Sequence, residues 1–152
     1  MKLKTEICDV DETEIIIRCS GRTEKIKNLE MMLESWLLQS SELVLTLDDT
    51  EYYVPKKDIL FFETENGKVT AHTSSRVFYT DYKLYELEKL MPPTFIRVSK
   101  SCILNVDAVS AIHHNITGAS EVIFKRGDKK VFVSRAYYKM LKDKIYEMRF
   151  NT

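Results

Sequence analysis

Apolar and polar residues alternate on both sides of Ser99-Lys100-Ser101, and this pattern constrains the fold more than any other feature of the chain. The alternation covers residues 96–98 and 102–106. Side chains on a strand switch faces at every residue, so two half-buried strands joined by a polar turn are predicted. Two hydroxyls flanking a cation can donate hydrogen bonds to an anion, and nucleic-acid phosphate is the commonest large one. The alternative is a solvated turn on an ordinary β domain.

The same period of two begins at Leu43 and predicts a mainly β domain, α+β overall, with a few short helices. Strands are expected at residues 43–47, 51–54, 58–63, 68–73, 76–79, 95–98, 102–106, 109–113, 121–125 and 130–133. Turns are expected at Asp48-Asp49, Pro55-Lys56-Lys57, Asn66-Gly67 and Arg126-Gly127-Asp128. Asn-Gly tolerates positive φ at both central positions, so residues 63–69 give the strongest hairpin signal.

Two helices are expected within this region. Residues 82–91 have a helical apolar face, with Asp81 as the N-cap and Pro92-Pro93 as the stop signal. Ser134 is expected to cap a final helix. The buried stripe of that helix is Tyr137, Leu141, Ile145 and Met148.

Residues 1–40 have a different pattern and predict a small β-β-α appendage that oligomerises or senses, followed by the main domain at 43–152. Strands are expected at 2–8 and 13–19, and a helix at 23–38. The helix has an apolar stripe consisting of Ile26, Leu29, Leu33, Trp36 and Leu37. The appendage is too small to bury this stripe alone. Trp36 is therefore either a core residue or part of a dimer interface.

The net charge of zero conceals a division between the two parts of the chain. Residues 1–96 hold 12 Lys and Arg against 18 Asp and Glu, a net charge of −6. Residues 97–152 hold 11 against 5, a net charge of +6. This asymmetry indicates a basic surface for a polyanion, although a chance partition of charges is the alternative.

Several function classes are disfavoured by missing motifs. The scattered glycines form neither a phosphate loop nor a dinucleotide fingerprint, and no nucleophile-elbow sequence is present. The adjacent His113 and His114 would point to opposite faces of a strand, so no metal site is expected. An odd number of cysteines without ligand spacing fits a reduced protein, and we see no membrane span or signal peptide. A cytoplasmic, non-enzymatic protein without a cofactor is expected.

Five pieces of the chain together resemble the LytTR DNA-binding domain, a mostly β family of bacterial transcription regulators without a helix-turn-helix. The resemblance covers about residues 43–148. The matching pieces, in family order and spacing, are Asp58-Ile59-Leu60-Phe61-Phe62-Glu63, the hairpin with Lys68, Leu84-x-x-Leu87-x-x-x-Met91, Phe95-x-Arg97-x-Ser99-Lys100-Ser101-x-x-x-Asn105, and Val133-Ser134-Arg135-x-Tyr137. The resemblance implies that loops enter successive major grooves, usually at direct repeats, and bend the DNA.

The resemblance also implies DNA-binding positions in three segments. They are Asn66 and Lys68 in the hairpin, Arg97, Ser99, Lys100 and Ser101 around the turn, and Ser134 and Arg135 before the last helix. The family pattern has His where this chain has Ser99 and Arg where it has Lys100. Lysine lacks the planar fork that reads guanine bidentately, so looser specificity is expected at position 100. Arg97 and Asn105 have structural roles as alternatives.

Arg135 has support that does not depend on the family. If Ser134 is the N-cap, Arg135 lies in the first helical turn, where a cation is unfavourable to the helix dipole by a few tenths of a kcal/mol. A cation placed against local electrostatics suggests a use outside the helix, and the alternative is a tolerated surface arginine.

The expected partner is double-stranded DNA, bound by a regulator that resembles the response-regulator class but lacks the length and acidic pocket of a receiver domain. A homodimer is expected because family sites are paired. Standalone family members commonly neighbour membrane proteins in their operons, which suggests a regulatory membrane-protein partner. The alternative function is a protein-interaction module on the same fold that binds an acidic or membrane-protein partner.

Overall fold

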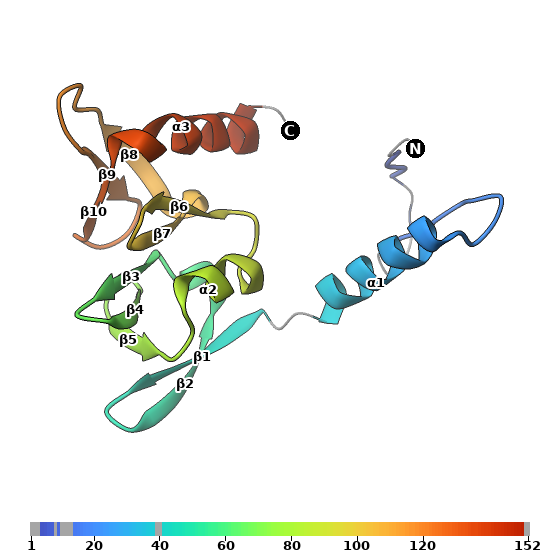
Figure 1. Cartoon of the computed structure of the whole chain (residues 1–152), viewed down its shortest axis with the longest axis horizontal. Coiled ribbons are helices and arrows are strands. Elements are labelled where there is room, and N and C mark those ends of the chain that lie inside the picture. The colour runs from blue at the N-terminus through green and yellow to red at the C-terminus, as the bar shows by residue number, and fades with distance from the viewer. Residues whose placement is uncertain (1–3, 8, 10–13, 39–40, 151–152) are drawn as a thin grey trace. The chain divides into compact units, whose positions relative to one another are not determined.

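The structure is a computed structural model that describes residues 4–7, 9, 14–38 and 41–150, with side chains described outside 34–38. The chain divides into two compact units, residues 1–39 and residues 40–152 (Figure 1). Among the described residues, no helix is both long enough and apolar enough to span a bilayer.

The first unit contains the helix α1 (Glu24–Leu38), which confirms the helix predicted there. Thr23 begins it: its carbonyl oxygen accepts a hydrogen bond from the Lys27 amide (3.0 Å). Ile26, Leu29 and Leu33 are half-buried, whereas the stripe residues Trp36 and Leu37 lie outside the described side chains.

The two strands expected in this unit are wrong for the residues that the structure describes. Residues 4–7, 9 and 14–19 form no strand, and Ile7 and Ile16 are 99% and 65% exposed. An isolated pair of strands is marginal in water unless a further element covers its apolar face, and no ladder forms here. The remaining residues of the two expected strands, Cys8 among them, lie outside the described part.

The second unit contains a seven-stranded antiparallel sheet with the strand order β2-β1-β5-β4-β3-β7-β6. Its strands are β1 (Glu42–Leu47), β2 (Thr50–Pro55), β3 (Phe61–Glu65), β4 (Lys68–His72), β5 (Val77–Thr80), β6 (Phe95–Ser99) and β7 (Cys102–Asn105). Two hairpins close with both central residues at positive φ: Asp48-Asp49 (49° and 59°) and Asn66-Gly67 (52° and 77°). Positive φ at both positions is typical of a type I′ turn, so the Asn-Gly hairpin prediction is confirmed.

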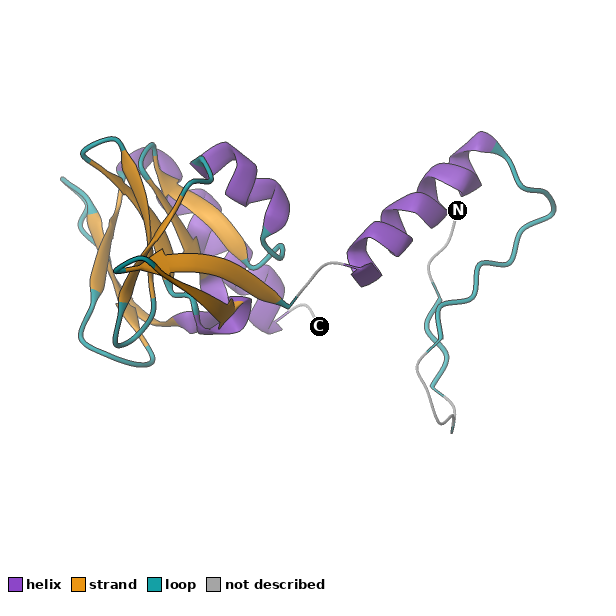
Figure 2. Ribbon diagram, turned by 90° about the horizontal axis from the view of Figure 1, so that it is seen from below, coloured by secondary structure: helices purple, strands orange, loops and turns teal. Residues whose placement is uncertain are grey.

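A second, three-stranded sheet and two helices complete this unit, and Figure 2 shows helices and strands by colour. The small sheet has the order β10-β9-β8, from β8 (Val109–His113), β9 (Ser120–Phe124) and β10 (Lys130–Val133). The helices are α2 (Leu84–Leu90) and α3 (Arg135–Phe150). The mainly β prediction with short helices is therefore confirmed.

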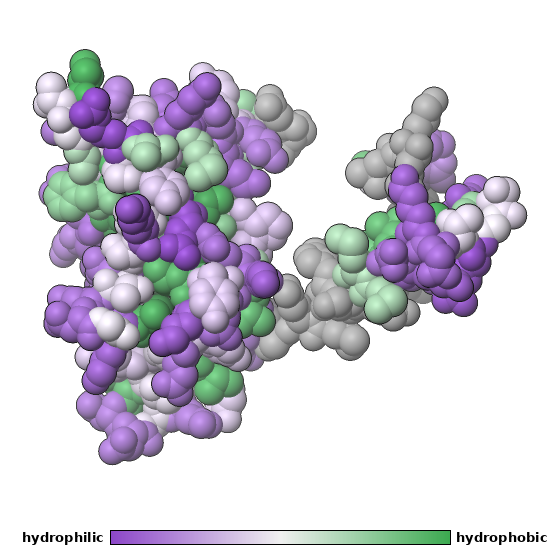
Figure 3. Space-filling model, in the orientation of Figure 1, coloured by the Kyte–Doolittle hydropathy of each residue, from purple (hydrophilic) through white to green (hydrophobic). Residues whose placement is uncertain are grey.

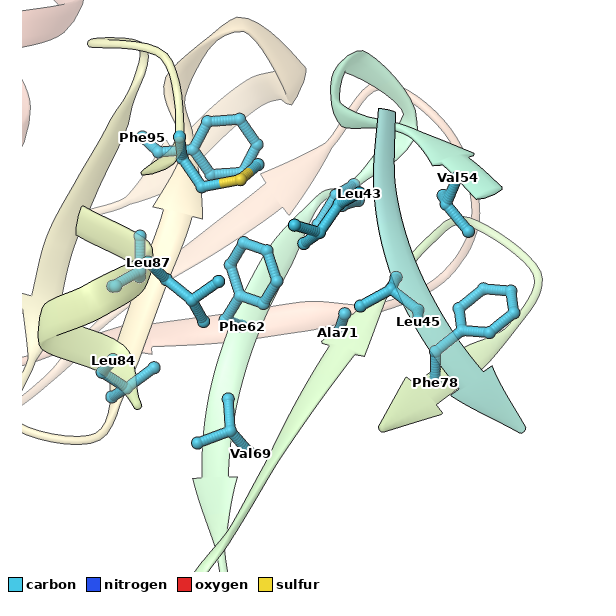
Figure 4. Close-up of a cluster of buried hydrophobic side chains, with 13 residues drawn as sticks. Leu43, Leu45, Val54, Phe62, Val69, Ala71, Phe78, Leu84, Leu87 and Phe95 are labelled. Atoms are coloured by element: carbon cyan, nitrogen blue, oxygen red, sulfur yellow. The ribbon is translucent and has the colours of Figure 1, made fainter. Parts of the chain in front are cut away.

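One face of the large sheet packs against α2. Phe62 of β3 is fully buried at the centre of this cluster, with Leu87 of α2 on one side and Ala71 of β4 on the other (Figure 4). This packing orders the end of β3, which leads into the Asn66-Gly67 turn.

The other face of the large sheet packs against the small sheet and α3. Phe61 of β3 stacks on Phe124 of β9, with ring centroids 5.6 Å apart, and Val98 of β6 is fully buried in the same cluster. Leu141 anchors the apolar stripe of α3 there, and Tyr137, Ile145 and Met148 are partly buried beside it, as their spacing predicted. Because side chains alternate between the two faces of a strand, β3 and β6 each contribute residues to both hydrophobic clusters.

Several element boundaries differ from the predicted ones. Lys83, not Asp81, is the N-cap of α2, and its amide donates to the Glu86 carboxylate (3.1 Å). The segments at 56–58 and 106–108 are 3-10 helices, η1 (Lys56–Asp58) and η2 (Val106–Ala108), rather than a turn and a strand end. In η1 the buried Lys56 ammonium donates to the carbonyl of Leu90 at the end of α2 (3.0 Å). The hydrogen bond from Lys56 joins residues 34 positions apart, so no periodicity in the sequence could predict it.

Candidate nucleic-acid interface

Three segments that the sequence singled out lie at one end of the large sheet (Figure 1). The amide of Thr64, near the tip of the β3–β4 hairpin, donates to the carbonyl of Ser101 in the β6–β7 turn (2.8 Å). The amide of Ser134, just before α3, donates to the carbonyl of Val98 at the end of β6 (3.0 Å). The hairpin, the turn and the start of α3 are therefore joined by backbone hydrogen bonds, and we call them together the loop end.

The β6–β7 turn presents Lys100 and Ser101 to solvent. Pairing shifts register between Arg97 and Ser99, an irregularity of the kind that re-aims side chains next to functional sites. The Ser99 hydroxyl accepts a hydrogen bond from the Ser101 amide (3.2 Å), which stabilises the turn. Within the described residues the Lys100 ammonium has no ion-pair partner, so it is free to meet an external anion.

Arg97 is positioned differently from Lys100. Its terminal nitrogen donates to the carbonyl of Lys100 (2.7 Å), and its Nε donates to the Glu88 carboxylate of α2 (2.9 Å). The guanidinium thus ties the turn to α2. Sequence reasoning missed Glu88, because no motif links two residues that lie nine positions apart in different elements.

The β3–β4 hairpin contributes less free positive charge. Asn66 and Lys68 are exposed at its tip, and Glu65 lies directly opposite Lys68 in the strand pairing. The Lys68 ammonium lies 6.0 Å from the centre of the Tyr79 ring. A carboxylate beside the only lysine of the tip weakens its attraction for phosphate.

The start of α3 is where the sequence placed it. The helix begins at Arg135, directly after Ser134, and the Ser134 carbonyl accepts from the Tyr137 amide (3.0 Å). Arg135 is exposed, and the described residues offer its guanidinium no carboxylate. The backbone amides of the first turn of a helix have no partner within the helix and can donate to a phosphate.

A cluster of titratable side chains, which includes His72, Lys129 and Cys102, lies near the face of the large sheet that packs against the small sheet. His72 stacks on Phe61 (centroids 4.1 Å apart), and its Nδ1 lies 3.4 Å from the Lys129 ammonium. Burial, and secondly the charge of Lys129, lower the pKa of His72 to about 4. Burial and, secondly, the charge of Glu63 raise the pKa of the Cys102 thiol to about 12. The charge of Arg97 acts in the opposite direction and lowers this pKa.

The histidines do not assemble into a metal site. His72 is half-buried and stacks on Phe61, whereas the exposed His114 stacks on Tyr138 of α3 (centroids 4.1 Å apart). In the part of the chain that the structure describes, no three His, Cys, Asp or Glu side chains are grouped to hold a metal ion.

A hollow of about 490 Å³ lies at the opposite end of the large sheet. It mixes cations and carboxylates, among them Lys57, Asp58, Asp107, Lys125 and Arg126. The Arg126-Gly127-Asp128 turn beside it is packed tightly, since a Cβ on Gly127 would lie 2.8 Å from the Ser74 carbonyl oxygen. Lys57 and Lys125 line this hollow and are remote from the loop end.

Hydroxyls and cations gathered on loops at one end of a β domain are the arrangement of a nucleic-acid-binding module. The visible face in Figure 3 is largely hydrophilic, with smaller hydrophobic areas between, which suits a polar partner. Comparison with known proteins gives the family: residues 49–146 match the LytTr DNA-binding domain. The chain belongs to the LytTR family of DNA-binding transcription regulators.

Individual relatives agree with this assignment. An uncharacterized HTH-type transcriptional regulator of Staphylococcus aureus strain NCTC 8325 is 33% identical over 107 residues, covering 70% of this chain and 72% of that protein. The corresponding protein of the bovine strain RF122 is 32% identical over the same length. A solved LytTr DNA-binding domain from Bacillus cereus is similar with a TM-score of 0.64 and 25% identity, covering 70% of this chain and 97% of that one.

Proposed function

We propose that this protein is a cytoplasmic transcription regulator that binds direct-repeat promoter sites by inserting its loop end into the major groove. The observation that carries the proposal is the hydrogen-bonded convergence of the β3–β4 hairpin, the β6–β7 turn and the start of α3. In the described residues the helices α2 and α3 are separated by five strands, β6 to β10, so loops rather than a helix-turn-helix would meet the bases.

Each proposed DNA-binding residue has a role that follows from its surroundings. Lys100 in the β6–β7 turn and Arg135 at the start of α3 are exposed cations and would read bases, Arg most effectively through bidentate contacts to guanine. The exposed Ser101 and half-buried Ser99 and Ser134 would donate to phosphates and fix the register. We assign Arg97 a positioning role, because both ends of its guanidinium already have partners within the protein.

Asn66 and Lys68 would make the third contact of the loop end. Asn66 has the amide that pairs with adenine in the major groove, and Lys68 would contact phosphate. The opposing Glu65 reduces the expected contribution of this hairpin.

The first experiment is selection from a random duplex library with the purified protein, followed by titration of the recovered duplex at several salt concentrations. Recovery of a direct repeat supports the proposal, and log K should fall linearly with log salt because each neutralised phosphate releases counterions. No binding at low salt, or an affinity indifferent to salt, contradicts it. That result would favour the alternative, an interaction module that binds an acidic protein partner.

We further propose that residues 1–40 link two copies of the chain. The observation is the apolar stripe of α1, in which the described members Ile26, Leu29 and Leu33 are only half-buried. A second copy would cover these side chains and place two loop ends on paired half-sites.

A further inference from the structure

Three cations lie along one side of α3 on its solvent face. Arg135, Lys139 and Lys142 are spaced by four and three residues, which places them one above another on a helix. All three are exposed, and the described residues offer none of them a carboxylate partner. We call these three residues the α3 basic stripe.

Of the two carboxylates of α3, Asp143 lies one turn beyond Lys139, at the edge of the stripe, and no ion pair between them is found among the described residues. Asp143 and Glu147 are four residues apart, and Glu147 pairs with Lys144 (3.7 Å), which is outside the stripe. The side of the helix occupied by Tyr138 is covered by His114, which stacks on it at an interplanar angle of 7°. The stripe therefore keeps three exposed cations without an ion-pair partner among the described residues, with one carboxylate, Asp143, at its edge.

The helix runs away from the loop end. It starts where the Ser134 amide meets the Val98 carbonyl, at the end of β6. Near its last turn, the Arg149 guanidinium donates to the carbonyls of Val106 and Val109, at the other end of β7. Arg135 is therefore at the loop end, and the two lysines follow behind it.

The spacing of the stripe matches the depth of the groove that the loop end is proposed to enter. With a rise of about 1.5 Å per residue, Lys139 lies about 6 Å and Lys142 about 10.5 Å behind Arg135. The major groove is roughly 8.5 Å deep. If α3 points along the depth of the groove, a tip that reaches the base edges places Lys139 beside the phosphate wall and Lys142 at its rim.

We infer that Lys139 and Lys142 bind phosphates along the wall of the major groove that Arg135 enters, and so set how deeply the loop end docks. This inference rests on the proposed function and adds a DNA-binding surface that extends along α3. The contacts are to the backbone and therefore carry no base preference. Lys139 is the stronger contact, because it lies within the groove depth.

The test measures affinity against salt for charge-neutral variants. Lys139→Gln and Lys142→Gln are compared with the wild type on the selected duplex and on a scrambled duplex of equal length. Each lost phosphate contact should reduce the slope of log K against log salt by about 0.9 and weaken both duplexes by the same factor. Lys139→Arg keeps the charge and should retain the wild-type slope.

The matched control is the double variant Lys57→Gln/Lys125→Gln, which removes two exposed lysines at the opposite end of the sheet. It changes the net charge as much as Lys139→Gln/Lys142→Gln does. If the two double variants lose slope equally, overall charge is responsible and the inference is wrong. If Lys139→Gln/Lys142→Gln keeps the wild-type slope while Arg135→Ala loses affinity, the inference fails and the proposed function stands. If the wild type binds neither duplex, both the inference and the proposed function are wrong.

Discussion

The guanidinium of Arg97 donates to the carbonyl oxygen of Lys100 at 2.7 Å, and this hydrogen bond fixes the backbone of the turn that carries Lys100, an exposed cation of the loop end. The same guanidinium pairs with Glu88 of α2 at 2.9 Å, with the Arg97 side chain 23% and the Glu88 side chain 39% exposed. A partly exposed ion pair of this kind contributes little to folding, on the order of 0–1 kcal/mol. Its main effect is therefore on the geometry of the turn.

Replacing Arg97 with Gln should weaken DNA binding by roughly 1–2 kcal/mol, since a hydrogen bond to a charged donor is lost from the turn. The free energy of unfolding should change by no more than about 1 kcal/mol. Fluorescence anisotropy with a labelled duplex and urea unfolding measure the two quantities, and Lys89→Gln on the neighbouring helix α2 is the control.

Glu88→Gln tests whether Arg97 positions the β6–β7 turn or contacts DNA directly. If Arg97 positions the turn, loss of its carboxylate partner should lower DNA affinity. If Arg97 instead contacts DNA, removing the competing carboxylate should raise DNA affinity, and the positioning role would be rejected.

Arg135 should contribute base discrimination, because it is exposed in the first turn of α3, next to the β6–β7 turn. Arg135→Ala should cost roughly 1–3 kcal/mol on the selected duplex and much less on a scrambled one. Lys125→Ala, at the opposite end of the sheet, should leave both affinities nearly unchanged. Circular dichroism checks that both variants fold. Equal weakening of the two duplexes by Arg135→Ala would mean that the role of Arg135 is electrostatic only.

The sequence was most informative where local chemistry determines the backbone. Asn66-Gly67 predicted a hairpin because few other pairs accept positive φ at both positions, and the structure has this turn. Ser134 likewise marked the start of α3, since a small polar residue before an apolar helical period is a start signal. Period-two alternation located every strand of the second unit to within a few residues.

What the sequence could not show depends on contacts between distant residues. The pairing of Arg97 with Glu88 and the burial of Lys56 against the end of α2 arise from tertiary packing. The strands expected from the β-branched run at residues 15–17 do not form among the described residues, because propensity alone gives a strand no partner. The order of strands in the sheet was also not predicted. The sequence alone therefore could not show that the three loops converge, and only the family resemblance implied a shared DNA-binding surface.

Acid should destabilise the fold through His72. Its pKa falls from 6.5 to about 4 in the folded state because of burial and of Lys129. The unfolded state then binds more protons between these values, so the stabilisation is complete above pH 6.5 and is lost as pH falls toward 4. The loss should approach roughly 2–3 kcal/mol. Urea unfolding at a series of pH values measures it.

His72→Gln should flatten the decline of stability between these pH values, and His113→Gln is the control for loss of an exposed imidazole. Glu63 acts in the opposite direction, because burial and Glu65 raise its pKa and so favour its protonated form in the folded state. The quantity to compare is therefore the change in the free energy of unfolding with pH, measured for the variant and for the wild type. An unchanged pH dependence in His72→Gln would exclude His72 as the responsible group.

Removing residues 1–40 should leave a folded monomer with weaker binding to paired half-sites. Residues 40–152 form their own compact unit and contain both hydrophobic clusters, so the shortened chain should unfold cooperatively. Two linked half-sites gain from effective concentration, and loss of the link should weaken binding by roughly 10²-fold or more. Binding to a single half-site should be nearly unchanged, since the loop end is retained. Sedimentation of the full and shortened chains, free and on DNA, measures the oligomeric state. A full-length protein that stays monomeric in both conditions would contradict the dimer and favour a sensing role for residues 1–40.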